Sequence, residues 1–412
     1  MLAQTVHDEI QFSDLIPAVT AFLTGFVRWN HSPLLCSQLF GTGSLISLFK
    51  NSQAERDHLP ASCLPAVRPI CSPSLFGKMM DRSVLQTPEA KEVALSLLPV
   101  QLGLSSSRGI QSLAAFSLGA VLQGNCVGKG DFSSAFQEID RDTILFALSA
   151  KQPALSTYFS RSLLAPTPMI AFDDQRVAQV VWSSRGVPQG SVPGSFLFGV
   201  GVHSVFGRLQ TEFPEFFLRA ATDDLITVVR PPASGSFGDW QELFVRYEGV
   251  LTRFETLSWD LCSLRQNIAK GALVLPVGAP LPSVGTLVLF SADFKFLSLD
   301  FVHTASTPFT SRLDGCVVGG APVGSLSFVD AFVQFKTDQA ITKLQPLREL
   351  GITNAHDAFK VLSTCGVKLL SYVAQVVPPS FTVGHLVRFD EEVRSIFFGF
   401  LILQTHPAPS LT

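Results

Sequence analysis

Charged residues of both signs are scarce in this sequence, and its cysteines are not closely paired. Charged residues make up 15% of the 412 residues, and the formal net charge is −3. This balance gives no bulk electrostatic signal for a nucleic-acid or anionic-membrane partner, so any such binding would need a local basic surface. The seven cysteines are scattered without a CxxC pair. They indicate reduced thiols in a reducing compartment and disfavour a disulfide framework or a zinc site.

Long apolar runs are also few, and no signal-peptide pattern is visible. The N-terminal residues MLAQTVHDEIQF do not have the basic-then-apolar order of a signal peptide. The two long uncharged stretches, residues 186–207 and 271–292, contain prolines and glycines, and the run IFFGFLIL is too short to span a bilayer. We therefore expect an intracellular protein, nuclear or cytoplasmic, that is not secreted and has no membrane partner.

Hydrophobic residues, by contrast, are abundant. They make up 47% of the chain, which predicts folded order nearly throughout and two or three packed units. Short apolar runs that end in glycine, proline or charged residues alternate with segments of helical periodicity. From about Ser327 onward the pattern is helical. The sequence thus predicts a mixed α/β body and a helical C-terminal unit, with the boundary near the glycine-rich residues 314–325.

Adjacent aspartates occur twice, as Asp173–Asp174 and as Asp223–Asp224. Chance produces such pairs in a chain of this composition, so a pair alone indicates no function. The first pair precedes Gln-Arg between two apolar arms, which predicts a hairpin turn. The second, in LRAATDDLITVV, also suits a hairpin turn, although it has no glycine, asparagine or proline beside it.

A third carboxylate, Asp131, ends a short strand in GKGDFSSAF. Carboxylates on distant strands can converge when those strands are neighbours in a sheet. Mg²⁺ prefers oxygen ligands from a few carboxylates plus substrate phosphates. Two such ions about 4 Å apart stabilise the attacking and leaving oxygens of a phosphoryl transfer. Asp131, Asp223 and Asp224 are therefore candidate ligands for two Mg²⁺ ions, for which Mn²⁺ could substitute.

A series of short motifs occurs in a fixed order along the chain: LISLFKN, AVRPICSPSLFGKMMDR, LPVQLGLSSSRGIQSL, DFSSAFQEIDRDTILFAL, SSRGVPQGSVPGSFLF, AATDDLITVV, LRQNIAKGALVL and LDGCVVGGAPVGSLSFVDAF. Together they resemble the motifs of reverse transcriptases, and most closely those of the non-LTR (LINE-type) retrotransposon family. The resemblance covers roughly residues 45–401. It implies an α+β right-hand polymerase with three parts. These are fingers (residues 1–115), a palm with an antiparallel sheet (116–326, with a fingers insertion around 145–182) and a helical thumb (327–412).

The resemblance also implies roles for single residues. Asp131 and Asp223 would bridge the two metal ions, Asp224 would support them, and Lys270 would stabilise the pyrophosphate leaving group. The residues implied to contact the incoming nucleotide are Lys50, Arg68, Phe136, Gln189 and Gly190.

Each of these roles has an ordinary alternative. Phe136 would be a steric gate against the ribose 2′-hydroxyl, or else one core phenylalanine among 35. Lys50 and Arg68, taken singly, are typical of solvated surface charges. Ala221 and Thr222 stand where the family usually has an aromatic residue and then a small one.

The implied function is that of an RNA-directed DNA polymerase, which adds dNTPs to a primer 3′-hydroxyl. Its partners would be an RNA template and a DNA or RNA primer. The chain would be either part of a larger product with a nuclease or a stand-alone polymerase domain. Two alternatives stay open: a catalytically decayed or co-opted retroelement protein that binds RNA without polymerising, and an RNA-dependent RNA polymerase.

Overall fold

The computed structural model of the protein describes residues 43–49, 67–104, 108–172, 176–282, 294–304 and 307–405. The chain divides into two compact units. Unit 1 comprises residues 1–105, 132–208 and 254–266, and unit 2 comprises residues 106–131, 209–253 and 267–412. Each unit is therefore assembled from three stretches that are distant in sequence.

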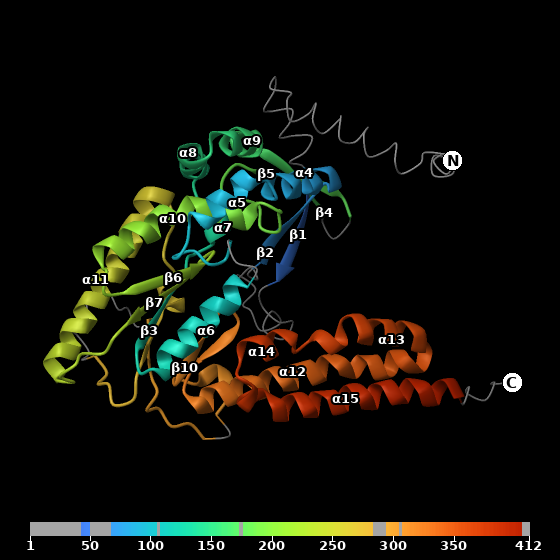
Figure 1. Ribbon diagram of the computed structural model, residues 1–412. Helices are drawn as coiled ribbons and strands as arrows, with labels where there is room; N and C mark the ends of the chain where they lie inside the picture. The colour runs from blue at the N-terminus through green and yellow to red at the C-terminus, as the bar shows by residue number, and fades with distance from the viewer. Residues whose placement is uncertain are drawn as a thin grey trace. The chain divides into compact units, whose positions relative to one another are not determined.

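Unit 1 contains a four-stranded sheet with the order β2-β1-β4-β5 (Figure 1). Strands β1 (Gly43–Phe49) and β2 (Val67–Pro73) are antiparallel. Strand β4 (Thr167–Phe172) pairs with β1 in parallel and with β5 (Ala178–Ser183) in antiparallel orientation. The motif LISLFKN thus falls largely on β1.

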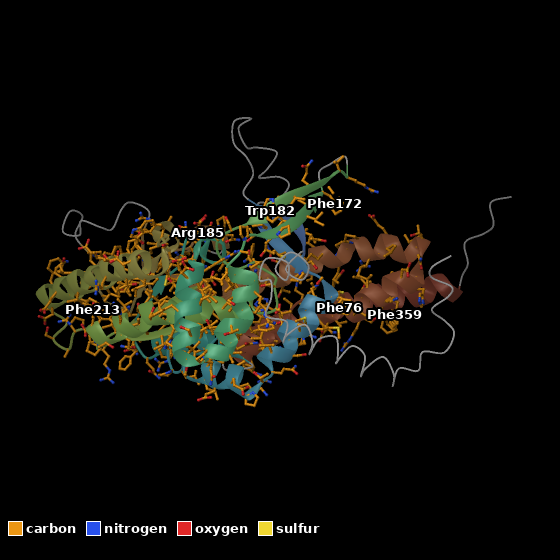
Figure 2. The ribbon with its side chains drawn as sticks, turned by 90° about the horizontal axis from the view of Figure 1, so that it is seen from above. Phe76, Phe172, Trp182, Arg185, Phe213 and Phe359 are labelled. Atoms are coloured by element: carbon orange, nitrogen blue, oxygen red, sulfur yellow. The ribbon has the colours of Figure 1, made fainter. Side chains whose placement is uncertain are left out.

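The β4–β5 hairpin confirms the prediction made from two apolar arms around a polar turn. Asp173–Asp174, predicted to form that turn, lie outside the described residues. The hairpin exposes aromatic rings, since Phe172 is 63% and Trp182 is 54% exposed (Figure 2). Exposed β-branched and aromatic residues still form a strand because their side chains fit the pleated surface.

Some helices of unit 1 begin at positions with a side-chain cap. Helix α4 follows Ser74, whose hydroxyl accepts a hydrogen bond from Gly77 N at 3.1 Å. Helix α8 follows Asp140, whose side chain accepts from Asp142 N, and it has an acidic residue, Asp142, in its first turn, where the helix dipole favours it. The helices that contribute to unit 1 are α4 (Leu75–Leu85), α5 (Pro88–Leu95), α7 (Ala135–Glu138), α8 (Arg141–Lys151), α9 (Pro153–Leu163) and parts of α10 (Gly194–Glu212) and α11 (Phe237–Cys262).

An aromatic cluster forms part of the core of unit 1. The ring centroid of Phe132 lies 5.0 Å from that of Phe254 and 6.3 Å from those of Phe198 and Phe206. All four rings are buried. These separations lie in the range that favours tilted and edge-to-face aromatic pairs. The cluster therefore joins α10 and α11 to the segment that leads into α7.

Unit 2 contains a five-stranded sheet with the order β6-β7-β3-β8-β9. Its strands are almost fully buried and carry few charges, as expected of a sheet covered on both faces. They are β6 (Phe217–Ala221), β7 (Asp224–Val229), β3 (Cys126–Gly130), β8 (Ala272–Leu275) and β9 (Lys295–Ser298).

The expectation of an antiparallel sheet is only partly right. The β6–β7, β7–β3 and β3–β8 pairs are antiparallel, whereas β8 and β9 run parallel. Parallel neighbours need a connection of a dozen or more residues. Residues 276–294 supply such a connection, and it is too long to be read from the sequence as a hairpin.

Two helices lie on opposite faces of this sheet. Gly128 of β3 faces Tyr247 of α11. Arg219 lies in the same row of paired residues as Ile226 and Lys129, and its guanidinium is 5.6 Å from the ring centroid of Phe116 in α6 (Gly109–Leu122). Because neighbours along a strand point to opposite faces, Lys129 lies on the α6 side and Gly128 on the α11 side.

The C-terminal part of unit 2 is helical, as predicted. The long helices α12 and α15 lie side by side (Figure 1), and their apolar faces share one core with α6, α13 and α14. The element bounds are α12 (Leu326–Thr353), α13 (Ala355–Thr364), α14 (Ser371–Val376) and α15 (Pro379–Thr405).

A two-stranded hairpin precedes α12. It joins β10 (Gly315–Val318) to β11 (Ala321–Gly324) through Gly319 and Gly320, whose φ angles are 53° and 80°. A two-residue hairpin turn with positive φ at both positions favours glycine. The Tyr372 hydroxyl donates a hydrogen bond to the Gly319 carbonyl, which holds the turn against α14.

Substitution by alanine at two glycines of unit 2, Gly128 and Gly119, is expected to change the free energy of unfolding in opposite directions. A Cβ at Gly128 would overlap the Tyr247 hydroxyl and Thr227 Oγ1, whereas a Cβ at Gly119, inside α6, meets nothing within 4 Å. We expect Gly128→Ala to lower the free energy of unfolding by about 1–3 kcal/mol through overpacking. Gly119→Ala should raise it by up to about 1 kcal/mol through helix propensity. Urea unfolding of the two variants checks this, and equal signs would contradict it.

Candidate active site

The β3–β7 pair brings two of the predicted carboxylates to the same end of the sheet. Its antiparallel register ends where Gly130 pairs with Leu225. Asp131 is the residue after Gly130 and Asp224 is the residue before Leu225, so one further step of this register sets the two aspartates opposite each other, and the charge of Asp131 acts on Asp224. Residues opposite each other in an antiparallel pair lie on one face of the sheet and are close neighbours. Two aspartates 93 positions apart in the chain thus meet at one end of the sheet of unit 2.

The third carboxylate lies in the turn that joins β6 to β7. Ala221 pairs with Asp224, so Thr222 and Asp223 form a two-residue turn, and the predicted hairpin is confirmed. Thr222 takes a φ of 57°, which is unusual for a β-branched residue. Its hydroxyl can donate to the Ala221 carbonyl at 2.7 Å or to Asp223 Oδ1 at 3.0 Å. Backbone strain of this kind is concentrated at functional sites.

Asp131 is buried and has a cationic partner. Only 6% of the residue is exposed, and its Oδ2 lies 2.6 Å from Lys270 Nζ. Its backbone carbonyl accepts a hydrogen bond from Asn267 N at 2.8 Å. Asn267 precedes the short helix η1 (Ile268–Lys270), which leads into β8. The structure therefore brings the predicted lysine to the first predicted aspartate.

A second lysine on the same face was missed by the sequence analysis. Lys129 stands two residues before Asp131, so strand alternation puts both side chains on one face. Its ammonium donates a hydrogen bond to the Val317 carbonyl of β10 at 2.9 Å. The signal available in the sequence was a single lysine inside the otherwise apolar run CVGKG.

The pKa of Asp224 reflects both the burial and the neighbouring charges of the site. Burial, above all, raises its pKa to about 6 from an ordinary 3.8. The neighbouring charges divide, since Lys129 and Lys270 favour the charged form and Asp223 and Asp131 oppose it. Carboxylates crowded into a partly buried site favour binding of a cation.

The donor chemistry of this site fits a divalent cation. Three aspartates supply only hard oxygen donors, which Mg²⁺ prefers, and the buried Oδ2 of Asp131 already has a cation, the Lys270 ammonium, beside it. The side chains are not gathered around a common point, however. Within the described ranges, no three carboxylate, thiolate or imidazole groups lie close enough together to hold a metal ion.

The raised pKa predicts how stability depends on pH. Folded Asp224 binds its proton more tightly than the unfolded chain does, so it destabilises the fold as pH rises from about 4 through 6. In metal-free buffer we expect Asp224→Asn to raise the free energy of unfolding at pH 7.5 by about 1–2 kcal/mol, and by less at pH 5. Urea unfolding at both pH values measures this. The control is Asp390→Asn, an exposed aspartate of α15, and an equal gain at both pH values would contradict the prediction.

Unit 1 holds the residues predicted to contact the nucleotide. Gln189 and Gly190 lie against β2, because Cys71 N donates to the Gln189 carbonyl at 2.7 Å. Gly190 has a φ of 95°, and an added Cβ would lie 2.7 Å from the Cys71 carbonyl, so glycine is required. Val187 N donates to the Phe136 carbonyl at 2.7 Å, which links this loop to α7.

The remaining predicted residues are only partly described. Arg68 lies in β2 opposite Leu48 of β1, and Lys50 lies outside the described residues. The predicted site residues thus divide between the units: Asp131, Asp223, Asp224 and Lys270 belong to unit 2, and Arg68, Phe136, Gln189 and Gly190 to unit 1.

Arg141 is a further residue that the sequence analysis missed. It is 6% exposed, and its guanidinium donates to the Gly186 carbonyl at 2.8 Å and to Ser183 Oγ at 2.9 Å. These hydrogen bonds hold residues 183–186, which lead into the Val187–Gly190 loop, against the start of α8. A cation in the first turn of α8, where the helix dipole disfavours it, was the available signal.

No protein-family model matches the chain. A stretch of 104 residues is 36% identical to the retrotransposable element SLACS 132 kDa protein of Trypanosoma brucei gambiense. This stretch covers 25% of the chain and 9% of that protein.

Two solved structures are distantly similar. One is apo telomerase from Candida tropicalis, truncated from the C-terminal domain, with a TM-score of 0.38 and 10% identity over 59% of this chain and 52% of that one. The other is telomerase from Candida albicans in complex with a fragment of telomeric RNA, with a TM-score of 0.42 and 10% identity over 97% of this chain and 67% of that one. Separately, none of the helices in the described ranges has the length and apolarity needed to cross a membrane.

Proposed function

We propose that the protein is an RNA-directed DNA polymerase that adds dNTPs to a primer 3′-hydroxyl. The observation that carries this proposal is the register that sets Asp131 opposite Asp224, with Asp223 in the adjoining turn and Lys270 paired with Asp131. The local identity to a retrotransposable element protein supports it. The matched stretch covers only 9% of that relative. The polymerase activity as a whole is therefore part of the proposal.

In this proposal Asp131, Asp223 and Asp224 hold two Mg²⁺ ions, with Mn²⁺ as a substitute. When bound, the ions neutralise charge on the attacking and leaving oxygens of the phosphoryl transfer. Lys270, which pairs with Asp131, would stabilise or protonate the pyrophosphate leaving group with its ammonium.

The residues of unit 1 select and hold the nucleotide in this proposal. Lys50 and Arg68 neutralise the triphosphate, Gln189 and Gly190 lie beneath the nucleotide and the template base, and Phe136 excludes the ribose 2′-hydroxyl. The proposed parts are fingers (residues 1–115), palm (116–326, with the fingers insertion around 145–182) and thumb (327–412).

Primer extension on an RNA template tests the proposal directly. We expect a labelled DNA primer to be extended with dNTPs and Mg²⁺ or Mn²⁺, and far less with NTPs. Several salt concentrations are needed, because affinity for a nucleic-acid duplex falls steeply as salt rises. Efficient extension with NTPs would instead indicate an RNA polymerase. No extension with either substrate, combined with retained RNA binding in a gel-shift assay, would indicate a protein that binds RNA without polymerising.

A further inference from the structure

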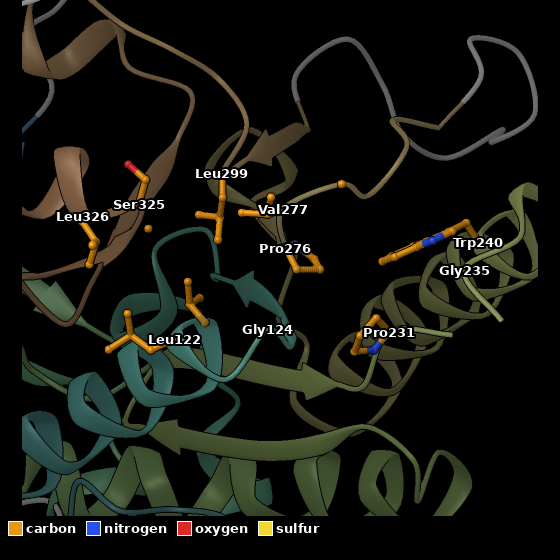
Figure 3. A pocket seen from close by; sticks show the side chains of 13 residues that line it. Leu122, Gly124, Pro231, Gly235, Trp240, Pro276, Val277, Leu299, Ser325 and Leu326 are labelled. Carbon is orange, nitrogen blue, oxygen red and sulfur yellow. The ribbon is translucent and has the colours of Figure 1, made fainter. Parts of the chain in front are cut away.

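Two cavities in unit 2 differ sharply in charge. The larger, of about 650 Å³, has no charged residue among the described residues that line it. Its side chains are mainly aliphatic or aromatic, such as Leu122, Trp240, Pro276, Val277 and Leu326 (Figure 3). Such a lining has no group that could compensate the charge of a phosphate. The second cavity, of about 290 Å³, has the opposite character.

Four cations line the second cavity, and none of the described residues that line it is acidic. They are Lys129, Lys270, Lys295 and Arg312. The rest of the wall consists of glycines and apolar residues of η1, β8, β10 and the start of α12. Apolar walls lower the local dielectric, so charges on the rim act more strongly on a ligand than they would in bulk water.

The four cations differ in how far their charge is already compensated. Arg312 makes two bonds to Asp314, at 3.0 and 2.7 Å, and its side chain is 6% exposed. Lys270 is paired with Asp131. Lys129 contacts a neutral carbonyl, and Lys295 forms no ion pair with any described residue. Lys129 and Lys295 therefore leave the cavity positively charged.

We propose that this cavity is a binding site for pyrophosphate, reached from the Asp131–Lys270 pair. The inference deepens the proposed function and rests on it, because pyrophosphate is the leaving group of that reaction. Lys270 belongs both to the carboxylate site and to the cavity wall, so a leaving group beside Lys270 has a second basic site next to it. A cavity at the small end of ligand sites suits a compact, multiply charged anion.

The site would act after the chemical step. Pyrophosphate that moves from Lys270 toward Lys129 and Lys295 leaves the carboxylates free for the next nucleotide. No bond forms or breaks in this transfer. Lys295 is the discriminating residue, because it is exposed at the start of β9 and has no role in holding the three aspartates.

Isothermal titration of the metal-free protein with pyrophosphate in EDTA tests the site without catalysis. We expect binding that weakens about tenfold in Lys295→Ala, because one charge-assisted contact is lost. Lys91→Ala removes an equally exposed lysine from α5 in unit 1 and should leave the affinity unchanged. Orthophosphate should bind more weakly than pyrophosphate, since it carries less charge.

Several results would overturn the proposal. They are undiminished binding by Lys295→Ala, equal losses in Lys295→Ala and Lys91→Ala, and binding that requires Mg²⁺. A short oligonucleotide that binds with the same Lys295 dependence, while pyrophosphate does not, would assign the cavity to a nucleic-acid backbone. Failure of the proposed function is distinguishable, because absence of primer extension leaves this metal-free binding result intact.

Discussion

Asp223→Asn is expected to lower single-nucleotide primer extension by about 10³-fold or more while leaving urea unfolding nearly unchanged. The loss follows from removing one anionic ligand of the proposed metal pair. The fold should survive because Asp223 lies in a two-residue turn, and its described side-chain bond comes from the Thr222 hydroxyl. An asparagine Oδ1 can accept the same bond, so the turn keeps its geometry.

The control for this variant is Asp390→Asn, which makes the same chemical change on an exposed face of α15. Extension by this control should match wild type at equal protein concentration. If Asp223→Asn still extends the primer at the wild-type rate, the assignment of the carboxylates is wrong. The loss of primer extension in Asp224→Asn, measured in the same assay, shows which of the two adjacent aspartates matters more for the reaction. The sequence predicted direct metal binding by Asp223 and support from Asp224, and that ranking stays a prediction.

Local patterns in the sequence predicted several elements where they occur. The apolar run before Asp131 is β3. The two apolar arms over residues 169–182 form a hairpin, and the pattern from Ser327 onward is helical. These features depend on caps, periodicity and turn chemistry, which act over a few residues and can be read directly.

Pairing between distant segments could not be read in this way. The approach of Asp131 to Asp224 depends on the register of β3 against β7. If one strand were shifted by one residue along the other, one of the two carboxylates would point to the other face of the sheet. The parallel β8–β9 pair was missed for the same reason, because its partner strands are separated by a long connection. Convergence of the carboxylates could be suspected from the sequence, but the register that produces it could not.

The two missed cations show a further limit of sequence reasoning. Lys129 and Arg141 each look like single charges, for which a solvated surface is the ordinary expectation. In the folded chain Lys129 reaches Val317, 188 positions away, and Arg141 reaches Gly186, 45 positions away. What distinguishes them is burial and a distant carbonyl partner, and neither has a local signature.

Phe136→Ala is expected to reduce discrimination against ribonucleotides by roughly 10²-fold, because removal of the ring would open space for the 2′-hydroxyl. The structure separates this phenylalanine from its neighbour in the core. Phe132 is 2% exposed within the aromatic cluster, whereas Phe136 is partly exposed in α7 and stacks on Phe198 at 4.9 Å and 19°. A ring with one face packed and part of its surface exposed is held firmly enough to act as a steric barrier.

The measurement is the ratio of kcat/KM for a dNTP to that for the matching NTP on one RNA template. Phe172→Ala, an exposed phenylalanine of β4, is the control and should leave the ratio unchanged. A falling ratio with a stable fold would support the gate. A destabilised fold with an unchanged ratio would assign Phe136 to packing alone, because a structural role lowers the amount of active protein equally for both substrates. Efficient NTP incorporation by the wild type would show that no such gate operates, and would favour an RNA polymerase.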